Sequence, residues 1–275
     1  MTLHNLVVPG RSLGFILAMA ACLGAGASHA QTPPAQSKDP KMMAAVEDLV
    51  AANHILAREG ILPGYGHVSM RSPLDPSRIL IARSLGPGQV TAADIVELNA
   101  DCTPVASNSP LLYQERFIHC EIYKARPDVG AVVHSHTPYV IAFSVSKTPL
   151  RPVVNTGRML GFNGPPVHDV SDVGGVTNNL IATPEAGRSL AKTLGSNSVV
   201  LMRGHGSTVV AASVREVVPA AINVEGSAMI LAQALRLGTP VTYLNPKDYG
   251  NERLQREIGA EARGWNALKQ GAPGQ

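Results

Sequence analysis

The chain contains little charge and few aromatic side chains: of its 275 residues, 16% are charged and 4% are aromatic. The formal net charge is only +3, so nothing in the balance indicates binding to nucleic acid or to an anionic membrane surface. The sequence has no internal repeat and no glycine-rich dinucleotide or phosphate loop. These absences exclude repeat proteins and nucleotide-loop enzymes, and they leave one globular domain of ordinary size.

Cysteine is also scarce. Of the three cysteines, Cys22 lies in an N-terminal apolar segment, which leaves Cys102 and Cys120. An oxidising compartment would permit a disulfide between these two, but no spacing rule pairs them. Because Cys120 falls within a predicted helix as a small apolar residue, we expect no disulfide.

The N-terminus has no apolar run long enough for a membrane span. Residues 13–27 form a short apolar core, preceded by Arg11 and followed by the small-x-small pattern Ser28-His29-Ala30. A spanning helix needs about 20 apolar residues, so residues 1–30 are predicted to be a cleaved signal peptide. The prediction is export to the periplasm, with no membrane attachment after cleavage. The remaining chain has 22 basic and 20 acidic residues, a formal charge of +2.

Hydrophobic periodicity predicts alternating helices and strands after a disordered spacer at residues 31–40. Helices are expected over 41–60, 114–126, 138–145, 183–194 and 214–237. Strands are expected over 66–71, 78–82, 130–136, 198–203 and 207–211. Residues 149–176 are expected to be loop-rich, and residues 249–275 to form an exposed C-terminal helix and tail. Strands mixed with helices predict an α/β fold, with a single domain over residues 41–248.

Three histidines carry the strongest functional signal. His134 and His136 end the apolar run 131–133, and side chains at i and i+2 of a strand point to the same side. His205 lies between two glycines, after a second apolar run at 199–201. Three imidazoles with an open coordination position are typical of a catalytic divalent metal, whereas structural zinc sites use four ligands, mostly cysteine. We therefore expect one divalent ion per subunit, Zn²⁺ in the first place, with Mn²⁺ and Co²⁺ as alternatives.

These residues resemble the class II aldolase/adducin family from about residue 41 to 248. In the family's sugar-phosphate aldolases a glutamate stands nineteen residues before the first metal histidine, as Glu115 stands before His134. The segment around His205 looks like the family's third-ligand loop, and residues 66–71 look like its N-terminal substrate loop. The resemblance implies a central mixed or antiparallel sheet layered between helices, and a homotetramer with active sites at subunit interfaces.

Within the family, the chain is most similar to decarboxylases of hydroxylated aromatic, pyridine or muconic-semialdehyde acids. Residues 66–69, 82–84, 115–119 and 201–206 are typical of that branch. Phosphate-binding aldolases have asparagine at the position of His67 and paired serines where this chain has Tyr113-Gln114. Both departures argue against a sugar-phosphate substrate.

The resemblance also implies roles for individual residues. Glu115 is expected either to be a fourth metal ligand or to act as acid and base beside the metal. His119 lies one helical turn further along and either orients Glu115 or simply packs. Arginine is suited to bidentate capture of a carboxylate. The substrate-binding residues that the resemblance implies are His67, Ser69, Arg83, Ser84 and His119.

The sequence therefore predicts a divalent-metal-dependent lyase that cleaves a C–C bond through a metal-stabilised enolate. The first prediction is decarboxylation of a hydroxylated aromatic or muconic-semialdehyde-type acid. An aldolase acting on a small, non-phosphorylated hydroxy-carbonyl compound is the alternative. A non-catalytic, adducin-like interaction module is a third reading, disfavoured because the chain retains all three metal histidines. The expected partner is a small carboxylate or hydroxy-carbonyl substrate, and no nucleic acid.

Overall fold

A central β-sheet organises the chain. The structure, a computed structural model, describes residues 33–108, 110–174, 178–249 and 260–271. Within them, seven strands form one sheet in the order β3-β2-β1-β4-β7-β6-β5. Neighbouring strands are antiparallel except β5 and β6, which are parallel. The strands are β1 (His67–Arg71), β2 (Ile79–Ala82), β3 (Ile95–Leu98), β4 (Ala131–Ser135), β5 (Val167–His168), β6 (Val199–Met202) and β7 (Gly206–Ala211).

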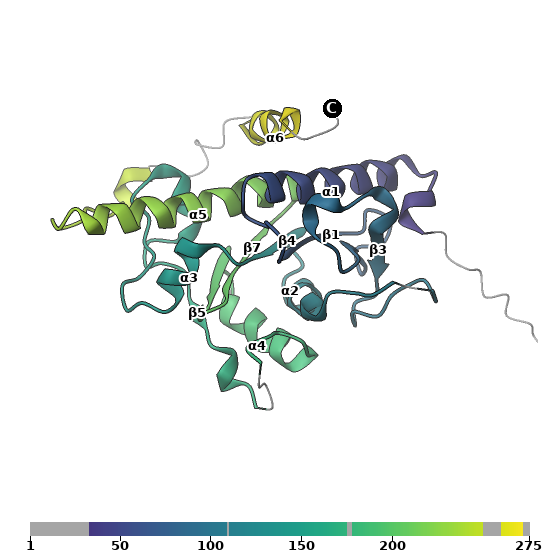
Figure 1. Cartoon of the computed structure of the whole chain (residues 1–275), viewed down its shortest axis with the longest axis horizontal. Coiled ribbons are helices and arrows are strands. Elements are labelled where there is room, and N and C mark those ends of the chain that lie inside the picture. Colours follow the sequence, from purple (N-terminus) through teal and green to yellow (C-terminus); the bar gives the residue numbers. More distant parts are fainter. Residues whose placement is uncertain (1–32, 109, 175–177, 250–259, 272–275) are drawn as a thin grey trace, which may run out of the picture. The chain divides into compact units, whose positions relative to one another are not determined.

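Helices cover both faces of this sheet. Figure 1 shows α1 and α5 on one face and α2 and α4 on the opposite face. The layered α/β architecture predicted from the sequence is therefore confirmed. The helices are α1 (Pro40–Arg58), α2 (Phe117–Ala125), α3 (Pro138–Ser144), α4 (Pro184–Leu194), α5 (Val214–Arg236) and α6 (Ala260–Gln270).

Alternation along the central strand β4 divides the core into two layers. Ala131 and Val133 pack in the cluster beneath α1 and α5, whereas Val132 packs in the cluster beneath α2 and α4. Side chains of a strand alternate between faces with period two. His134 therefore points to the same face as Val132, towards α2.

Helix α1 begins where a short polar residue meets proline. The side chain of Asp39 accepts from the backbone N–H groups of Lys41 and Met42, and Pro40 occupies the first helical turn, where its missing N–H costs nothing. Before it, a 3₁₀ helix spans Pro34–Gln36. The expected disorder of residues 31–40 is therefore wrong for residues 33–40, because a cap and a short helix order them.

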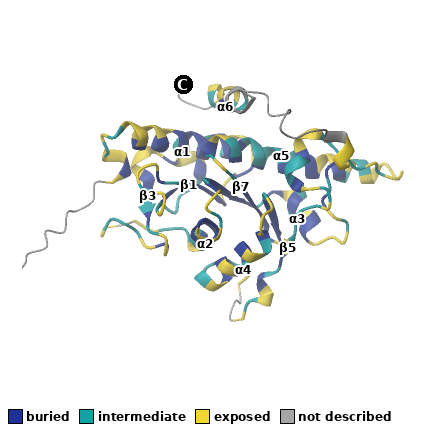
Figure 2. Ribbon diagram, turned by 180° about the vertical axis from the view of Figure 1, so that it is seen from behind, coloured by how far each residue is buried: buried dark blue, intermediate teal, exposed yellow. Residues whose placement is uncertain are grey.

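Helix α5 is the long apolar helix of the domain. It is long and apolar enough to cross a membrane by length and composition alone. One side of it, with Val217, Val224 and Leu231 among its apolar side chains, instead lies in the cluster beneath α1 and α5. Figure 2 shows α1 and α5 buried on the side that faces the sheet and exposed on the other. α5 is therefore one of the helices that cover the sheet and contribute side chains to the core.

Helix α6 packs against the rest of the domain. Trp265 is 1% exposed and belongs to the same apolar cluster as α1 and α5. Lys269 Nζ lies 2.6 Å from Glu47 Oε1, and Arg58 donates to the carbonyl of Leu268. The expectation of an exposed C-terminal helix is therefore wrong for its Trp265 face, because one large aromatic ring anchors it.

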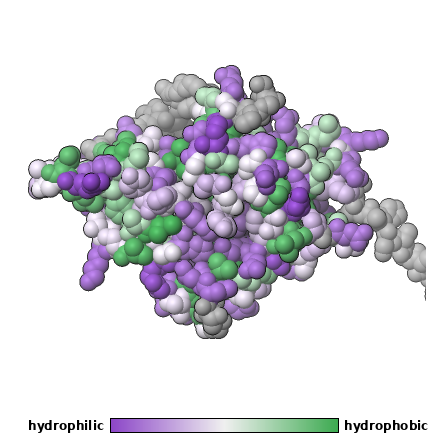
Figure 3. Space-filling model, in the orientation of Figure 1, coloured by the Kyte–Doolittle hydropathy of each residue, from purple (hydrophilic) through white to green (hydrophobic). Residues whose placement is uncertain are grey.

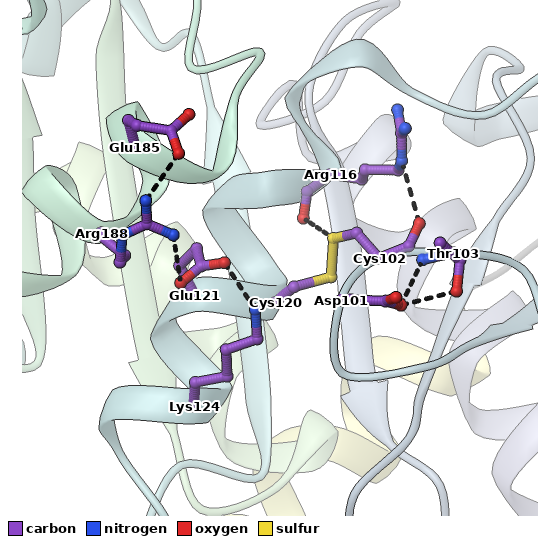
Figure 4. Close-up of polar contacts among 9 residues, drawn as sticks. All are labelled: Asp101, Cys102, Thr103, Arg116, Cys120, Glu121, Lys124, Glu185 and Arg188. Carbon is purple, nitrogen blue, oxygen red and sulfur yellow. Dashed lines mark hydrogen bonds and ion pairs between the residues drawn. A yellow bond between two sulfur atoms is a disulfide. The ribbon is translucent and has the colours of Figure 1, made fainter.

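The two remaining cysteines are bonded to each other. Cys102 and Cys120 form a disulfide with their Cα atoms 5.9 Å apart, so the expectation of no disulfide was wrong (Figure 4). Cys102 has a positive φ of 68°, in a turn where the Asp101 carboxylate accepts from the N–H and hydroxyl of Thr103. This turn brings the sulfur of Cys102 to α2, a geometry that depends on tertiary contact and not on spacing.

A buried carboxylate joins α2 to α4. Glu121 is 4% exposed, and its two oxygens lie 2.7 Å from Lys124 Nζ and 4.0 Å from Arg188 Nη1. Arg188 also pairs with Glu185 at 2.7 Å. Figure 4 shows this group on the side of α2 away from the disulfide, so α2 is held on both sides.

We predict that breaking the disulfide lowers stability without changing the fold. The bridge spans a sequence separation of 18 residues, and closing such a loop stabilises a protein by about 3 kcal/mol in the chain-entropy estimate. The Cys102→Ser, Cys120→Ser double variant should unfold at lower urea concentration than the oxidised chain. As a control, a thiol reductant should shift the midpoint of the wild type and leave that of the double variant alone. Equal midpoints for the oxidised wild type and the variant would contradict the prediction.

Candidate metal centre

Three imidazole nitrogens and one carboxylate oxygen converge at the ends of β4 and β7. His136 Nε2 lies 2.8 Å from His134 Nε2 and 3.1 Å from His205 Nε2. Glu115 Oε2 lies 3.5 Å from His134 Nε2 and 3.4 Å from His205 Nε2. The four ligand atoms all lie within 4.8 Å of one another. Residues up to 90 positions apart in the sequence are thus brought to one point.

The protonation of His134 suits a metal ligand. Its Nδ1 lies 3.0 Å from the carbonyl oxygen of Ser207, which can only accept, so Nδ1 carries the proton and Nε2 offers a lone pair. Ligand atoms around a tetrahedral zinc ion, with bonds of about 2.0–2.1 Å, lie about 3.3–3.4 Å apart. The distances of 2.8 to 3.5 Å within this cluster span that value. The residues therefore fit one divalent ion.

Two glycines allow the close approaches that assemble the cluster. A Cβ at Gly206 would lie 1.9 Å from the backbone oxygen of Ser135, so only glycine lets the start of β7 press against β4 beside His136. Gly66 has a φ of +84°, and a Cβ there would lie 2.5 Å from the backbone oxygen of His134. Glycine adopts this left-handed conformation without steric cost. These contacts bring His205 and His67 to the end of β4.

Glu115 is oriented by a backbone donor. It lies in the 3₁₀ turn Gln114–Arg116 that leads into α2. One carboxylate oxygen accepts from the N–H of Ile181 at 2.9 Å, which leaves the other facing the histidines. Burial raises the pKa of the Glu115 carboxyl, but the hydrogen bonds and positive charge that His134 and His205 supply in their protonated forms outweigh burial and hold that pKa well below its usual range. Glu115 is therefore an ionised ligand or an ionised base.

Behind the cluster runs a buried chain of hydrogen bonds. His67 Nδ1 lies 2.6 Å from His119 Nε2, and His119 Nδ1 lies 2.6 Å from Ser69 Oγ. Ser69 Oγ lies 2.9 Å from the hydroxyl of Tyr123. Burial and the charge of His134 lower the pKa of His119 to about 3; burial and the charge of His119 hold the pKa of His67 well below its usual value. His119 thus bonds to His67 and Ser69, where the sequence suggested either orientation of Glu115 or simple packing.

A pocket of about 520 Å³ opens beside the cluster. The ring of Tyr65 stacks on His136 at 6.3 Å between centroids with an angle of 10°. The ring of Tyr113 lies 4.7 Å from that of His67. Sequence reasoning missed both tyrosines as wall residues, although each flanks a motif that it used. The described wall consists of Gly64, Tyr65, Gly66, His67, Ser84, Leu85, Gly86, Tyr113, Gln114, Glu115, His136 and Leu180.

The structure brings only some of the predicted substrate-binding residues to this wall. His67 and Ser84 line the pocket. Ser69 and His119 are 0% exposed and lie behind it. The guanidinium of Arg83 donates to Asp94 Oδ1 at 2.6 Å, and Arg83 does not line the pocket. Asp94 is itself held by Thr91 in a capping box. The contact with this fixed carboxylate keeps the Arg83 guanidinium away from the pocket.

Comparison with known proteins identifies the family. Residues 47–232 match the model of the class II aldolase and adducin N-terminal domain, so the chain belongs to that family. Decarboxylase tropJ of Talaromyces stipitatus is 36% identical over 204 residues, covering 70% of this chain and 77% of that protein. The 3,4-dihydroxyphthalate decarboxylase of Arthrobacter keyseri is 30% identical over 219 residues, covering 74% and 83%. The solved aldolase II superfamily protein from Pseudomonas syringae has a TM-score of 0.70 at 26% identity, covering 84% of this chain and 93% of that one.

These comparisons confirm the predicted family and the prediction of a lyase-type enzyme. They contradict the predicted export to the periplasm, because the relatives are mostly soluble cytoplasmic enzymes. Residues 1–30, on which that prediction rested, lie outside the described residues. An apolar stretch followed by small residues was too weak a signal to decide the location of the protein.

We predict that His205→Ala abolishes tight binding of zinc. The variant removes one of three nitrogen ligands from a loop position, so the fold should survive while metal affinity falls by at least tenfold. Metal content after dialysis, measured by mass spectrometry, is the readout. His54→Gln is the matched control, because His54 bonds to the carbonyl of Val90 away from the cluster. Full zinc content in His205→Ala would refute the assigned ligand set.

We also predict that the metal-free chain loses stability as pH falls from about 6.5 to about 4. Burial lowers the pKa of His136 to about 4 and that of His119 to about 3, from the ordinary histidine value of 6.5. The unfolded chain therefore binds more protons in this window, so acid favours unfolding. Urea unfolding in the presence of a chelator measures the slope. His136→Gln should flatten it, whereas an unchanged slope in that variant would contradict the assignment.

Proposed function

We propose that this chain is a divalent-metal-dependent lyase that removes CO₂ from a hydroxylated aromatic or muconic-semialdehyde-type acid. The observation that carries the proposal is the cluster of His134, His136, His205 and Glu115 at the edge of a pocket with aromatic walls. Two relatives that cover most of the domain, tropJ and 3,4-dihydroxyphthalate decarboxylase, are named decarboxylases. Zn²⁺ is the proposed ion, with Mn²⁺ and Co²⁺ as alternatives.

The pocket wall supports a flat, non-phosphorylated substrate. Among the described wall residues there is no lysine or arginine, the side chains that usually bind phosphate. Tyr65 instead presents an aromatic ring against His136, and Tyr113 presents one against His67. Aromatic rings favour stacking with a planar substrate. This wall favours a planar acid over a sugar phosphate.

The side chains then have distinct tasks. A bound divalent ion supplies Lewis acidity that stabilises negative charge on substrate oxygens. His134, His136 and His205 hold its position, and Tyr65 and Tyr113 orient the substrate ring and exclude water. When the bond to the carboxylate carbon breaks, its electron pair stays on the ring carbon. Glu115 is ionised, so it serves by holding a water molecule whose proton goes to that carbon, and the hydroxide left behind takes a proton from the solvent.

A substrate panel tests the proposal. The zinc-loaded protein should release CO₂ from hydroxylated benzoates or phthalates, and release of CO₂ and of aldehyde should be followed separately. Glu115→Gln, which loses the charge but keeps the shape, should lower kcat by about 10²-fold or more. Aldehyde release from hydroxy-carbonyl adducts, without CO₂ release, would favour the aldolase alternative. No turnover of either substrate class by a fully zinc-loaded chain would refute the proposal.

A homotetramer stays a prediction from the family resemblance. Exposed apolar side chains on and just beyond α5 are Met229, Ile230, Leu235 and Leu237. Figure 3 shows apolar atoms interspersed with polar ones at the C-terminal end of α5. Analytical ultracentrifugation of the purified chain measures the assembly directly.

A further inference from the structure

The buried hydrogen-bond chain behind the metal centre has a direction that can be worked out from its ends. It contains three contacts, from Tyr123 to Ser69, from Ser69 to His119, and from His119 to His67. Each contact needs one proton. A hydroxyl group has one proton to donate, and a neutral imidazole has one N–H. Four groups therefore supply four protons for three contacts, and the arrangement leaves one N–H or O–H for another partner.

The tyrosine end determines where the spare proton lies. Among the described residues, the Tyr123 hydroxyl has no hydrogen-bond partner other than Ser69. Tyr123 is 5% exposed, and burial raises the pKa of its hydroxyl well above its usual value, so this group keeps its proton. A buried hydroxyl that fails to donate costs about 1–3 kcal/mol. Tyr123 therefore donates to Ser69.

The remaining protons follow in sequence. Because Ser69 accepts from Tyr123, its own proton goes to His119 Nδ1, its other neighbour. His119 must then carry its proton on Nε2, which donates to His67 Nδ1. His67 in turn carries its proton on Nε2. Any reversed chain leaves a hydroxyl of Ser69 or Tyr123 without an acceptor among the described residues.

The N–H without a partner, on His67 Nε2, is thus at the pocket end of the hydrogen-bond chain. His67 lines the pocket beside Glu115 and His136. Its Nδ1 is occupied by His119, and its Nε2 has no hydrogen-bond partner among the described residues. The same pocket wall has no described lysine or arginine. An N–H donor at His67 is consequently one of the few groups there that can bind an anionic oxygen.

We propose that Ser69, acting through His119, fixes His67 as a neutral imidazole that presents Nε2–H, and not a lone pair, to the substrate. His67 then binds a carboxylate or phenolate oxygen of the acid that the proposed function requires, and it does not serve as the base. Ser69 and His119 are positioning residues, since they touch His67 and not the pocket. The proposal deepens the proposed function and rests on it for the identity of the bound oxygen.

Nitrogen NMR tests the direction of the chain without any substrate. Two-bond proton–nitrogen correlations of histidine rings distinguish an Nδ1–H from an Nε2–H tautomer. In the full-length, zinc-loaded protein labelled with nitrogen-15 and protonated at its ring carbons, His67 and His119 should both be Nε2–H tautomers, with His67 assigned by the loss of its signals in His67→Gln. An Nδ1–H tautomer at His67 overturns the proposal.

Two variants that each remove one hydroxyl separate positioning from general packing. Ser69→Ala deletes the donor to His119 Nδ1, so the tautomers of His119 and His67 should become mixed. Tyr123→Phe is the matched control: Ser69 still has His119 Nδ1 as its acceptor, so the Nε2–H tautomers should persist. Unchanged tautomers in Ser69→Ala, or mixed tautomers in Tyr123→Phe, contradict the assigned role of Ser69.

Kinetics then connects the tautomer to substrate binding. On a substrate from which the wild type releases CO₂, Ser69→Ala should lower kcat/KM by about tenfold, the change expected when a hydrogen bond to a charged oxygen is weakened. Tyr123→Phe should lower it less than Ser69→Ala, and equal losses overturn the proposal. The two proposals fail separately: correct tautomers without turnover refute only the proposed function, whereas CO₂ release with an Nδ1–H tautomer at His67 refutes only this inference.

Discussion

The convergence of four ligand atoms on one point is the constraint on which this site depends. His136 Nε2 lies 2.8 Å from His134 Nε2 and 3.1 Å from His205 Nε2, with a carboxylate oxygen of Glu115 beside them. A lone pair on His134 Nε2 follows from its bond to the Ser207 carbonyl. A divalent cation bound at this point would be coordinated by these atoms, which would make metal binding and local stability one equilibrium.

The strands that hold the core also hold the site. On β4, Val132 packs against the α2 side of the sheet, and the same two-residue period carries His134 to that side. On β1, Ser69 pairs with Val132 and His67 pairs with His134, so the hydrogen-bond chain and the metal ligand lie on neighbouring strands. A slip of one residue in either strand would turn the histidine of that strand to the opposite face. The register that buries the valines therefore also brings His67 and His134 together.

Local patterns predicted most of the fold and singled out the histidines that the structure brings together in one cluster. The strand at residues 130–136 and the helix at 214–237 were expected within two residues of β4 and α5, because long periodic runs specify their own structure. The strand β5 has only two residues, too few to show an alternating hydrophobic pattern, so it was missed. Contacts made only in the folded chain were also missed: the disulfide to Cys102, the Arg83–Asp94 pair and the aromatic walls at Tyr65 and Tyr113. None of these contacts corresponds to a recognisable spacing of residues in the sequence.

Helix α2 connects the candidate metal centre with the hydrogen-bond chain. Glu115, His119 and Tyr123 recur every four residues, which places them on one face, towards β1 and β4. Glu115 reaches the metal centre, whereas His119 and Tyr123 form the hydrogen-bond chain to His67. The opposite sides of the helix are held by the disulfide and by Glu121. A shift of α2 along its axis would therefore disturb the Glu115 carboxylate and the His67 imidazole together, so the anchors of this helix fix the relative position of the two groups to which the proposed function assigns one substrate.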